Sequence, residues 1–321
     1  MKKLMTIAAA AFLAGSCFAQ QNLFGGAQVV SPQVNPDGTI TVRYQGAKAK
    51  TVKVEGDFLP EQLIETPQGV WAIHPAADLQ EVKPGIWEYT TPEPVAADYY
   101  TYTLLVDGVK TVDPANVYIN RDVATVTNQL IVSREKGDNG DLFSINDVPH
   151  GTVRTMWYHS AELGCDRRLT VYTPAGYETS GKKYPVFYLL HGAGGDEEAW
   201  SSMGRAAQIL DNLIEQGKAE PMIVVMPNGN PNQQAAATMG LPTTQMDWRN
   251  PENRNAYVRS LCEEIVPFIQ KEFRTIAKPE KRAIAGLSMG GGHTIAASNL
   301  YPAMFDYVCP LSAAGSATVE P

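Results

Sequence analysis

The sequence predicts two folded domains, an all-β sandwich over residues 28–133 and an α/β domain with a mainly parallel sheet over residues 148–321. Short alternating strand patterns separated by turn residues fill the first segment, whereas strand-like and helical runs alternate in the second. A Gly-x-Ser-x-Gly motif follows one of the apolar strand-like runs of the second segment. With 321 residues and 44% hydrophobic content, the chain can bury two cores.

The N-terminus has the pattern of a secretory signal peptide over residues 1–19. Two lysines precede the apolar run 4–13, and small residues at Cys17 and Ala19 predict cleavage after Ala19. The run is too short to be a transmembrane anchor. Acylation of Cys17, as in a lipoprotein, is the less favoured alternative, because Ala14 occupies a position where such signals usually carry leucine. We therefore expect a secreted or periplasmic protein.

Charge and cysteine content exclude several classes of function. The formal net charge is −8 and no basic block is present, so nucleic acid is not an expected partner. After cleavage, the cysteines are Cys165, Cys262 and Cys309, and this odd number at wide spacing is no disulfide framework. A single disulfide between Cys165 and Cys262 is an alternative that the sequence leaves undecided. Cys309 is expected to be a small buried thiol. No Cys/His cluster has metal-ligand spacing, so we expect no metal and no cofactor.

The first domain is predicted from alternating β-rich runs. The dipeptide Asp107-Gly108 lies between two such runs and predicts a hairpin. Regularly spaced strands without helical stretches indicate a β-sandwich. The segment 134–147 is polar and contains glycine, which predicts a linker between the domains. The predicted strands are 39–44, 51–55, 85–90 and 99–106.

The second domain is predicted from alternating strands and helices, the pattern of a parallel sheet covered by helices. The predicted strands are 168–172, 186–190, 223–226, 283–285 and 305–311, and the predicted helices are 204–216, 253–273 and 293–300.

Ser288 is the predicted nucleophile. It is the serine of Gly286-Leu287-Ser288-Met289-Gly290, which has a strand-like run before it and a helical run after it. This is the context of a nucleophile elbow, a sharp strand-to-helix turn that exposes the serine at the edge of a sheet. The motif therefore predicts an α/β-hydrolase fold with Ser288 as the residue that attacks an acyl group.

A second motif predicts an oxyanion hole. The apolar run 186–190 leads into His191-Gly192-Ala193-Gly194-Gly195. Such a loop can direct a backbone N–H into the site beside the N–H of the residue after the nucleophile. We expect the amides of Ala193 and Met289 to be these donors, with His191, Gly192 and Gly194 as the supporting loop.

No histidine is well placed to act as the general base. His191 belongs to the loop itself, and His293 is five residues beyond Ser288 on the outgoing helix, where its geometry for reaching the serine is poor. His150 and His159 precede most of the sheet, and His74 belongs to the first domain.

The acid of a catalytic triad is missing as well. Asp306 is the only acid between Ser288 and the last residues, apart from Glu320, and a capping or solvated role is expected for it. The predicted domain holds 174 residues (148–321), whereas α/β domains of this kind commonly run to about 200–250. We therefore expect a chain that is truncated at its C-terminus and inactive by itself.

Residues 150–308 resemble the esterase D-like carbohydrate esterases of family 1, which are feruloyl and acetylxylan esterases. The segments that carry this resemblance are 184–195, 224–229, 263–269 and 286–291. The first domain resembles the glycogen-binding-type module with an early-set immunoglobulin-like fold, found before such esterases in Bacteroidetes. Its matching segments are 69–71, 85–89, 102–108 and 113–116. The resemblance implies a triad completed by a histidine and an acid downstream of the serine, for which this sequence has no matching residue.

Four aromatic residues of the first domain have two interpretations. Trp71, Trp87, Tyr89 and Tyr100 could stack on sugar rings, which bury apolar surface against aromatic side chains. They could instead fill the sandwich core or an interface, and this is the favoured interpretation because strand aromatics usually pack inward.

The leading functional hypothesis is a secreted serine carboxylesterase that removes feruloyl or acetyl esters from plant cell-wall polysaccharide such as xylan, or from oligosaccharides bearing these esters. Two alternatives stay open: an acyltransferase of the same fold, in which a sugar hydroxyl replaces water, and a non-catalytic carbohydrate-binding protein.

Overall fold

The computed structural model describes residues 29–67, 69–121, 125–231, 253 and 255–313. The predicted signal peptide, with Cys17 and Ala19, lies outside these residues. Contacts divide the chain into two compact units: one joins residues up to 95 with 102–117, and the other joins 96–101 with the residues from 118 onward. The domain boundaries 28–133 and 148–321 remain a prediction. In the described ranges, no helix has the length and apolar character needed to cross a membrane.

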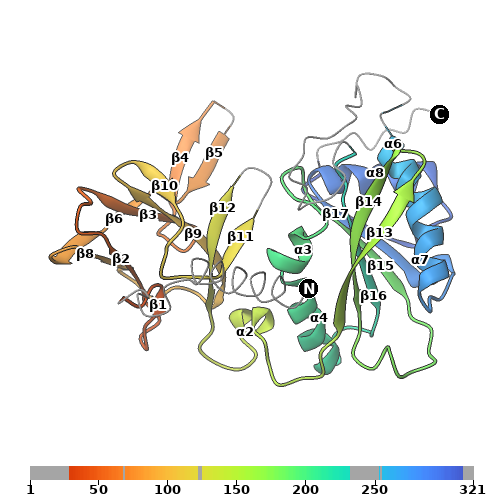
Figure 1. Cartoon of the computed structure of the whole chain (residues 1–321), viewed down its shortest axis with the longest axis horizontal. Helices are drawn as coiled ribbons and strands as arrows, with labels where there is room; N and C mark the ends of the chain where they lie inside the picture. The colour runs from red at the N-terminus through yellow and green to blue at the C-terminus, as the bar shows by residue number, and fades with distance from the viewer. Residues whose placement is uncertain (1–28, 68, 122–124, 232–252, 254, 314–321) are drawn as a thin grey trace, which may run out of the picture. The chain divides into compact units, whose positions relative to one another are not determined.

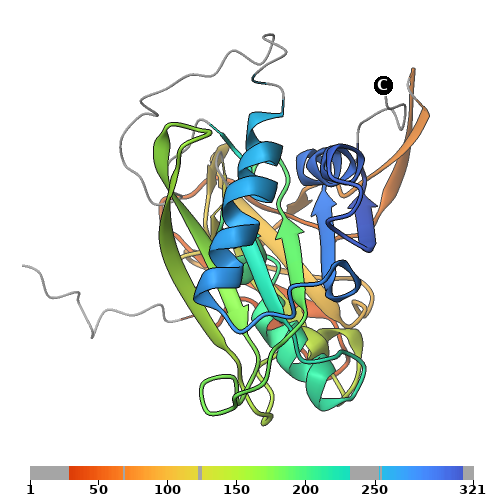
Figure 2. The same ribbon diagram turned by 90° about the vertical axis from the view of Figure 1, so that its right-hand side faces the viewer.

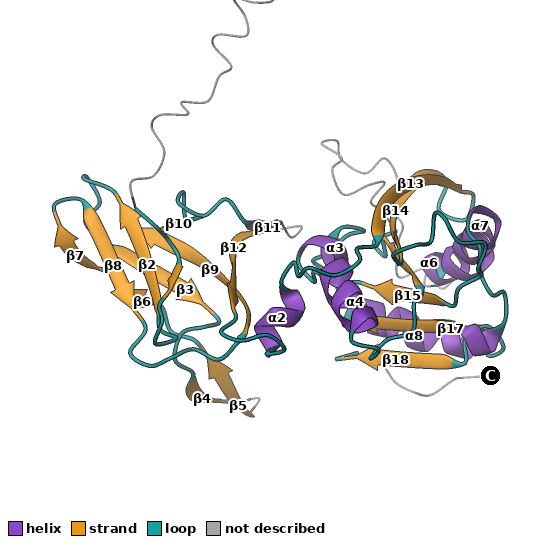
Figure 3. Ribbon diagram, turned by 90° about the horizontal axis from the view of Figure 1, so that it is seen from below, coloured by secondary structure: helices purple, strands orange, loops and turns teal. Residues whose placement is uncertain are grey.

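The described strands before residue 133 form two sheets and a hairpin (Figures 1 and 3). The first sheet has the order β1 (Gln33–Val34), β2 (Ile40–Gln45), β8 (Ile86–Thr90), β7 (Gln80–Lys83). The second has the order β11 (Ile119–Arg121), β12 (Val126–Val132), β9 (Asp98–Val106), β3 (Val52–Gly56), β6 (Ala77–Asp78), with β10 (Val109–Thr111) paired to β9. The separate hairpin is β4 (Gln62–Thr66) with β5 (Gly69–Ile73).

Alternation of apolar residues explains which face of each sheet is buried. Ile40 and Val42 of β2 are fully buried, and so are Val54 of β3 and Leu104 of β9, which lie opposite each other in the antiparallel β3/β9 pair. Side chains two residues apart share a face of a strand, so each sheet contributes one apolar face. This arrangement is the one expected of a β-sandwich, and the immunoglobulin-like topology remains a prediction.

The predicted hairpin at Asp107-Gly108 is confirmed. These two residues connect β9 to β10, in which Val106 is paired with Val109. Both adopt left-handed backbone angles, with φ of 50° at Asp107 and 82° at Gly108. A two-residue turn with positive φ at both positions matches the twist of the flanking strands.

The second unit contains a six-stranded sheet. Its order is β13 (Thr152–Ser160), β14 (Cys165–Thr173), β16 (Ile223–Pro227), β15 (Val186–Leu190), β17 (Arg282–Leu287), β18 (Tyr307–Leu311). The pairs β15/β16, β15/β17 and β17/β18 are parallel, and β13/β14 and β14/β16 are antiparallel. The predicted mainly parallel sheet is confirmed, with an antiparallel edge that the sequence did not indicate.

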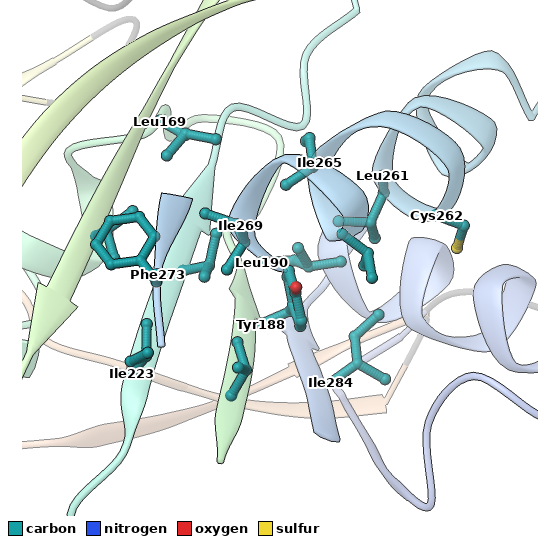
Figure 4. Close-up of a cluster of buried hydrophobic side chains, with 14 of the residues drawn as sticks. Leu169, Tyr188, Leu190, Ile223, Leu261, Cys262, Ile265, Ile269, Phe273 and Ile284 are labelled. Atoms are coloured by element: carbon teal, nitrogen blue, oxygen red, sulfur yellow. The ribbon is translucent and has the colours of Figure 1, made fainter. Parts of the chain in front are cut away.

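Helices pack on both faces of this sheet. Side chains alternate along each strand: Tyr188 and Val225 belong to the cluster under α6, η1, α7 and α8, whereas Phe187 and Val224 pack with α3 and α4. Figure 2 shows the helix formed by α6, η1 and α7 lying along one face, and Figure 4 shows its apolar side chains directed at the strands. The helix bounds are α3 (Ala199–Ser202), α4 (Ala206–Glu215), α6 (Ala256–Arg259), η1 (Ser260–Ile265), α7 (Val266–Glu272), η2 (Pro279–Lys281) and α8 (Met289–Leu300).

The segment predicted as a linker contains a short helix, α2 (Asn139–Phe143), rather than only extended chain. Asp138 caps its N-terminus by accepting a hydrogen bond from the N–H of Asp141. The side-chain amide of Asn212 in α4 donates to the carbonyl groups of Leu142 and Ser144. Helix α2 is therefore fixed to α4 within the second unit.

The three cysteines of the second unit are free thiols, so the Cys165–Cys262 bridge left open above is absent. Cys262 is buried as part of the apolar cluster under η1. The expectation of a buried Cys309 is wrong: this residue is exposed. The reason is that β18 is the edge strand of the sheet and all five of its residues are exposed.

Candidate active site

Ser288 occupies a strained turn between β17 and α8. Its backbone angles are φ 53° and ψ −109°, a region that residues with side chains rarely adopt, and its side chain is exposed. Although it lies at the N-cap position of α8, its hydroxyl makes no capping hydrogen bond to the helix. Such strain at an exposed serine is the geometry of a nucleophile elbow.

The two glycines of the motif are required by close backbone packing. A Cβ atom at Gly286 would lie 2.2 Å from the carbonyl oxygen of Gly290. A Cβ atom at Gly290 would lie 2.7 Å from the carbonyl oxygens of Leu190 and His191. Real Cβ atoms do not approach backbone this closely, so the turn can form only with glycine at both positions.

The glycine-rich loop after β15 lies beside Ser288. A Cβ atom at Gly192 would lie 3.7 Å from the Cβ atom of Ser288, which places the two chain segments in contact distance. Ala193 and Gly194 are exposed. Met289 is the first residue of α8, so its N–H has no acceptor inside the helix. The structure thus brings the predicted loop and the predicted nucleophile together, while the roles of Ser288, Ala193 and Met289 remain predictions.

His191 is fixed within the loop by hydrogen bonds at both ring nitrogens. The N–H of Gly229 donates to Nε2 at 2.8 Å, which assigns Nε2 as an acceptor. Nδ1 then carries the proton and donates to the carbonyl of Gly192 at 2.6 Å. Burial lowers the pKa of His191 below its ordinary value. Because its basic nitrogen is already occupied, His191 supports the loop and is not available as a general base.

A third segment, the loop after β16, completes the site and was not proposed from the sequence as functional. Gly229 donates to His191 as described, the side-chain amide of Asn230 donates to the carbonyl of Gly195 at 2.9 Å, and that of Asn228 donates to Glu197 at 3.0 Å. The run Val224–Gly229 carried the family resemblance but gave no chemical reason for a role. Only the fold shows that it holds the glycine-rich loop.

The remaining histidines have other partners. His150 pairs with Asp211 at 3.0 Å, and His159 pairs with Asp166 at 2.8 Å. His74 lies in the first unit, where its Nδ1 is 2.6 Å from the carbonyl oxygen of Leu59. All five histidines are in the described ranges, and no hydrogen bond joins any of them to Ser288 there.

His293 is an unusual case, because its Nδ1 is buried without a hydrogen-bond partner. Its ring packs against Tyr257, with the ring centroids 4.7 Å apart, and a Cβ atom at Gly229 would lie 3.5 Å from its Nδ1. Burial, with a smaller effect of the nearby His191, lowers the pKa of His293 to about 4. His293 is therefore a neutral packed side chain near the elbow, as the poor geometry expected from the sequence suggested. Asp306 is exposed.

The lowered pKa of His293 predicts a pH-dependent stability. The unfolded chain binds a proton at a pKa of about 6.5, whereas the folded protein binds it only near pH 4, so protonation favours unfolding. We expect the free energy of unfolding to be fully present above pH 6.5 and to fall by at most about 3 kcal/mol as the pH decreases to about 4. Urea unfolding across this range should show a smaller decrease for His293→Gln. His159→Gln, at an exposed ion pair, is the control and should follow the parent protein; an unchanged slope in His293→Gln would contradict the assignment.

Among the described residues, no group of three or more His, Cys, Asp or Glu side chains is arranged to hold a metal ion.

The four aromatic residues considered for sugar stacking lie on three different sheets. Tyr89 is opposite the fully buried Val42 in the β2/β8 pair, so it faces the buried side, and Trp87 shares that face two residues earlier. Tyr100 is on β9. Trp71 is on the separate β4–β5 hairpin and is 56% exposed. The structure therefore does not bring the four side chains onto one face, and Trp71 is the member most open to a ligand.

A family model described as "Putative esterase" matches residues 160–318, which include the glycine-rich loop, the loop after β16 and the Ser288 turn. All of the matched residues belong to the second unit.

Two curated relatives are similar in sequence. An "Endo-1,4-beta-xylanase/feruloyl esterase" of Xylanibacter ruminicola is 33% identical over 234 residues, which are 71% of this chain and 30% of that protein. "Esterase Rv1288" of Mycobacterium tuberculosis is 32% identical over 139 residues, covering 42% of this chain and 27% of that protein. The chain spans less than a third of the length of either relative.

A solved structure of an enterochelin esterase from Shigella flexneri is similar in fold. Its TM-score is 0.55 at 14% identity, and the alignment covers 86% of this chain and 71% of that one.

Proposed function

We propose that this protein is a secreted serine carboxylesterase that removes feruloyl or acetyl groups from plant polysaccharide such as xylan. The observation that carries the proposal is the strained, exposed Ser288 with the glycine-rich loop directly beside it. A relative that is named as a xylanase and feruloyl esterase supports the choice of substrate. The predicted signal peptide supports export.

In the proposed reaction, the Ser288 hydroxyl oxygen attacks the acyl carbonyl carbon while a histidine takes the hydroxyl proton. The N–H groups of Ala193 and Met289 hold the negative oxygen of the tetrahedral intermediate. The bond to the sugar oxygen then breaks, and the histidine returns the proton to that oxygen. Water attacks the acyl-enzyme in the second half of the reaction, which releases the acid and restores the serine.

The histidine of this scheme is not among the five described ones, since each of them is bonded elsewhere or buried. We propose that the base and its acid are supplied from outside the described residues. The edge strand β18 is compatible with this proposal. Strands of a parallel sheet are ordinarily covered on both faces, yet Tyr307 is 62% exposed and Val308 and Leu311 are about 40% exposed.

An assay of ester hydrolysis tests the proposed function. We expect methyl ferulate and p-nitrophenyl acetate to be hydrolysed by a form of the protein that contains such a histidine, and not by the 321-residue chain. Hydrolysis by the 321-residue chain that depends on Ser288 would contradict the proposed source of the base. If neither form is active but the chain binds xylan in a pull-down, the non-catalytic alternative is correct. Product analysis with an acceptor sugar separates hydrolysis from acyl transfer.

We further propose that the strands before residue 133 contact polysaccharide. Trp71 supports this, because its indole ring is exposed on a hairpin together with Leu63 and Val70, which are 65% and 64% exposed. Exposed aromatic rings of this kind can stack on the apolar face of a sugar.

A further inference from the structure

We propose that Glu197 is a positioning residue that holds the oxyanion loop in its working conformation, and this inference rests on the proposed function. Glu197 follows Ala193 by four residues, directly after the glycine-rich loop. Its side chain is fully buried, with 0% exposure. A charged side chain is rarely buried to this extent unless it is paired, so its partners indicate what it does.

The first partner is Arg168 on β14. Its Nε donates to one carboxylate oxygen of Glu197 at 2.6 Å, and the arginine side chain is only 15% exposed. A second nitrogen of the same guanidinium donates to Glu198 at 2.6 Å. One arginine on a rigid strand therefore fixes two consecutive residues that follow the loop.

The second partner is Asn228, which donates to the other carboxylate oxygen of Glu197 at 3.0 Å. Asn228 is itself fixed, because Arg167 of β14 donates to its carbonyl oxygen at 2.5 Å. The next residue, Gly229, donates to His191. Glu197 and His191 thus attach the two ends of the glycine-rich loop to one short segment after β16.

This arrangement places the loop between two fixed points. Residues 191 and 197 are both bonded to 228–229, and the predicted oxyanion donor Ala193 lies between them. Buried ion pairs contribute little net stability compared with apolar packing, so stability alone does not explain this one. They can specify one conformation, and the conformation specified here is that of the loop that carries the predicted oxyanion donor Ala193.

The test compares Glu197→Gln with Glu178→Gln. Glutamine has nearly the same shape as glutamate, but one of its two terminal groups is an NH2 group. It therefore cannot accept hydrogen bonds from Arg168 and Asn228 at two separate oxygens, as the carboxylate does. Glu178 pairs with Arg154 at the surface, where the two side chains are 54% and 39% exposed, so its variant is a matched control. Both variants are first checked for cooperative urea unfolding.

Hydrogen exchange measured by mass spectrometry reports how often the backbone amides of the loop open to solvent, and it does not require an active enzyme. We expect the backbone amides of residues 191–198 and 228–230 to exchange about ten-fold faster in Glu197→Gln, while exchange in the strands of the sheet stays unchanged. Glu178→Gln should match the parent protein. Parent-like exchange in a folded Glu197→Gln would overturn the proposal.

Kinetics of the active form supply the second readout. Loss of one oxyanion donor costs about 100- to 1,000-fold in kcat, so a displaced donor should lower kcat by about 10- to 100-fold. KM for methyl ferulate should change by less than about three-fold, because ground-state contacts are retained. A higher KM that lowers kcat/KM while kcat stays constant would overturn the positioning role. Absence of activity in every form would contradict the proposed function, while the exchange experiment would still decide on Glu197.

If Glu197→Gln does not fold, Arg168→Lys carries the same test. Lysine keeps the positive charge but cannot donate to Glu197 and Glu198 together in a planar fork. We expect faster exchange in 191–198 and a lower kcat in this variant as well. Parent-like values of both in Arg168→Lys would contradict the proposed clamp.

Discussion

Replacing Ser288 with alanine is expected to lower the kcat for methyl ferulate by about 10⁴- to 10⁶-fold in the form of the protein that hydrolyses it. The reason is that the alanine side chain has no oxygen to form the acyl-enzyme, so only stabilisation by the loop amides would remain. Intact-protein mass spectrometry after rapid acid quench should show a feruloyl adduct on the parent protein and none on Ser288→Ala.

Ser298→Ala is the matched control for this experiment. Ser298 is on the same helix, ten residues further along, where its hydroxyl donates to the carbonyl of Ile295. We expect its kcat to lie within about two-fold of the parent value, because a local bond to the helix backbone contributes little. Hydrolysis by Ser288→Ala at a comparable rate would exclude the serine mechanism.

Replacing Gly290 with alanine is expected to decrease the free energy of unfolding by about 3 kcal/mol or more. The new methyl group would lie 2.7 Å from the carbonyl oxygens of Leu190 and His191. These are backbone atoms of β15 and the glycine-rich loop, so they cannot move aside as a flexible side chain does. The start of α8 would have to separate from β15, which would also displace Ser288 from the loop.

Urea unfolding at pH 7.5 measures this loss, and Gly181→Ala is the control. Gly181 has no atom within 4 Å of an added Cβ and no left-handed backbone angle, so its variant should remain within about 0.5 kcal/mol of the parent. A Gly290→Ala protein with parent stability would show that the close packing of elbow and loop is not required.

Much of the second unit was predictable because its local patterns agree with its tertiary structure. The predicted strands 186–190 and 223–226 became β15 and β16, and the predicted helix 253–273 became α6, η1 and α7. In these segments the apolar residues recur at the spacing of a buried face, so local pattern and packing favour the same structure. Of the antiparallel pair β13/β14, only β14 was predicted. β13 was missed because most of its residues are exposed and its apolar residues do not recur at the spacing of a buried face.

The candidate site was predictable only in part. Ser288 and the loop 191–195 were found because their motifs have a chemical reason that can be read locally. Glu197, Asn228 and Arg168 were missed because their relationship exists only across three chain segments. The four aromatic residues for which both sugar stacking and core packing were considered are a similar case, because the topology distributes them over three sheets.

The sequence by itself determined the fold class of the second unit, the nucleophile candidate and the loop beside it, because hydrophobic period and glycine positions constrain the backbone locally. Only the tertiary structure decided the burial, the hydrogen-bond partners and the protonation of the histidines. It placed the N–H of Gly229 on Nε2 of His191 and packed His293 against Tyr257 in a buried position. Protonation depends on burial and on partners distant in sequence, and these are set by how the strands and loops pack, not by their order along the chain.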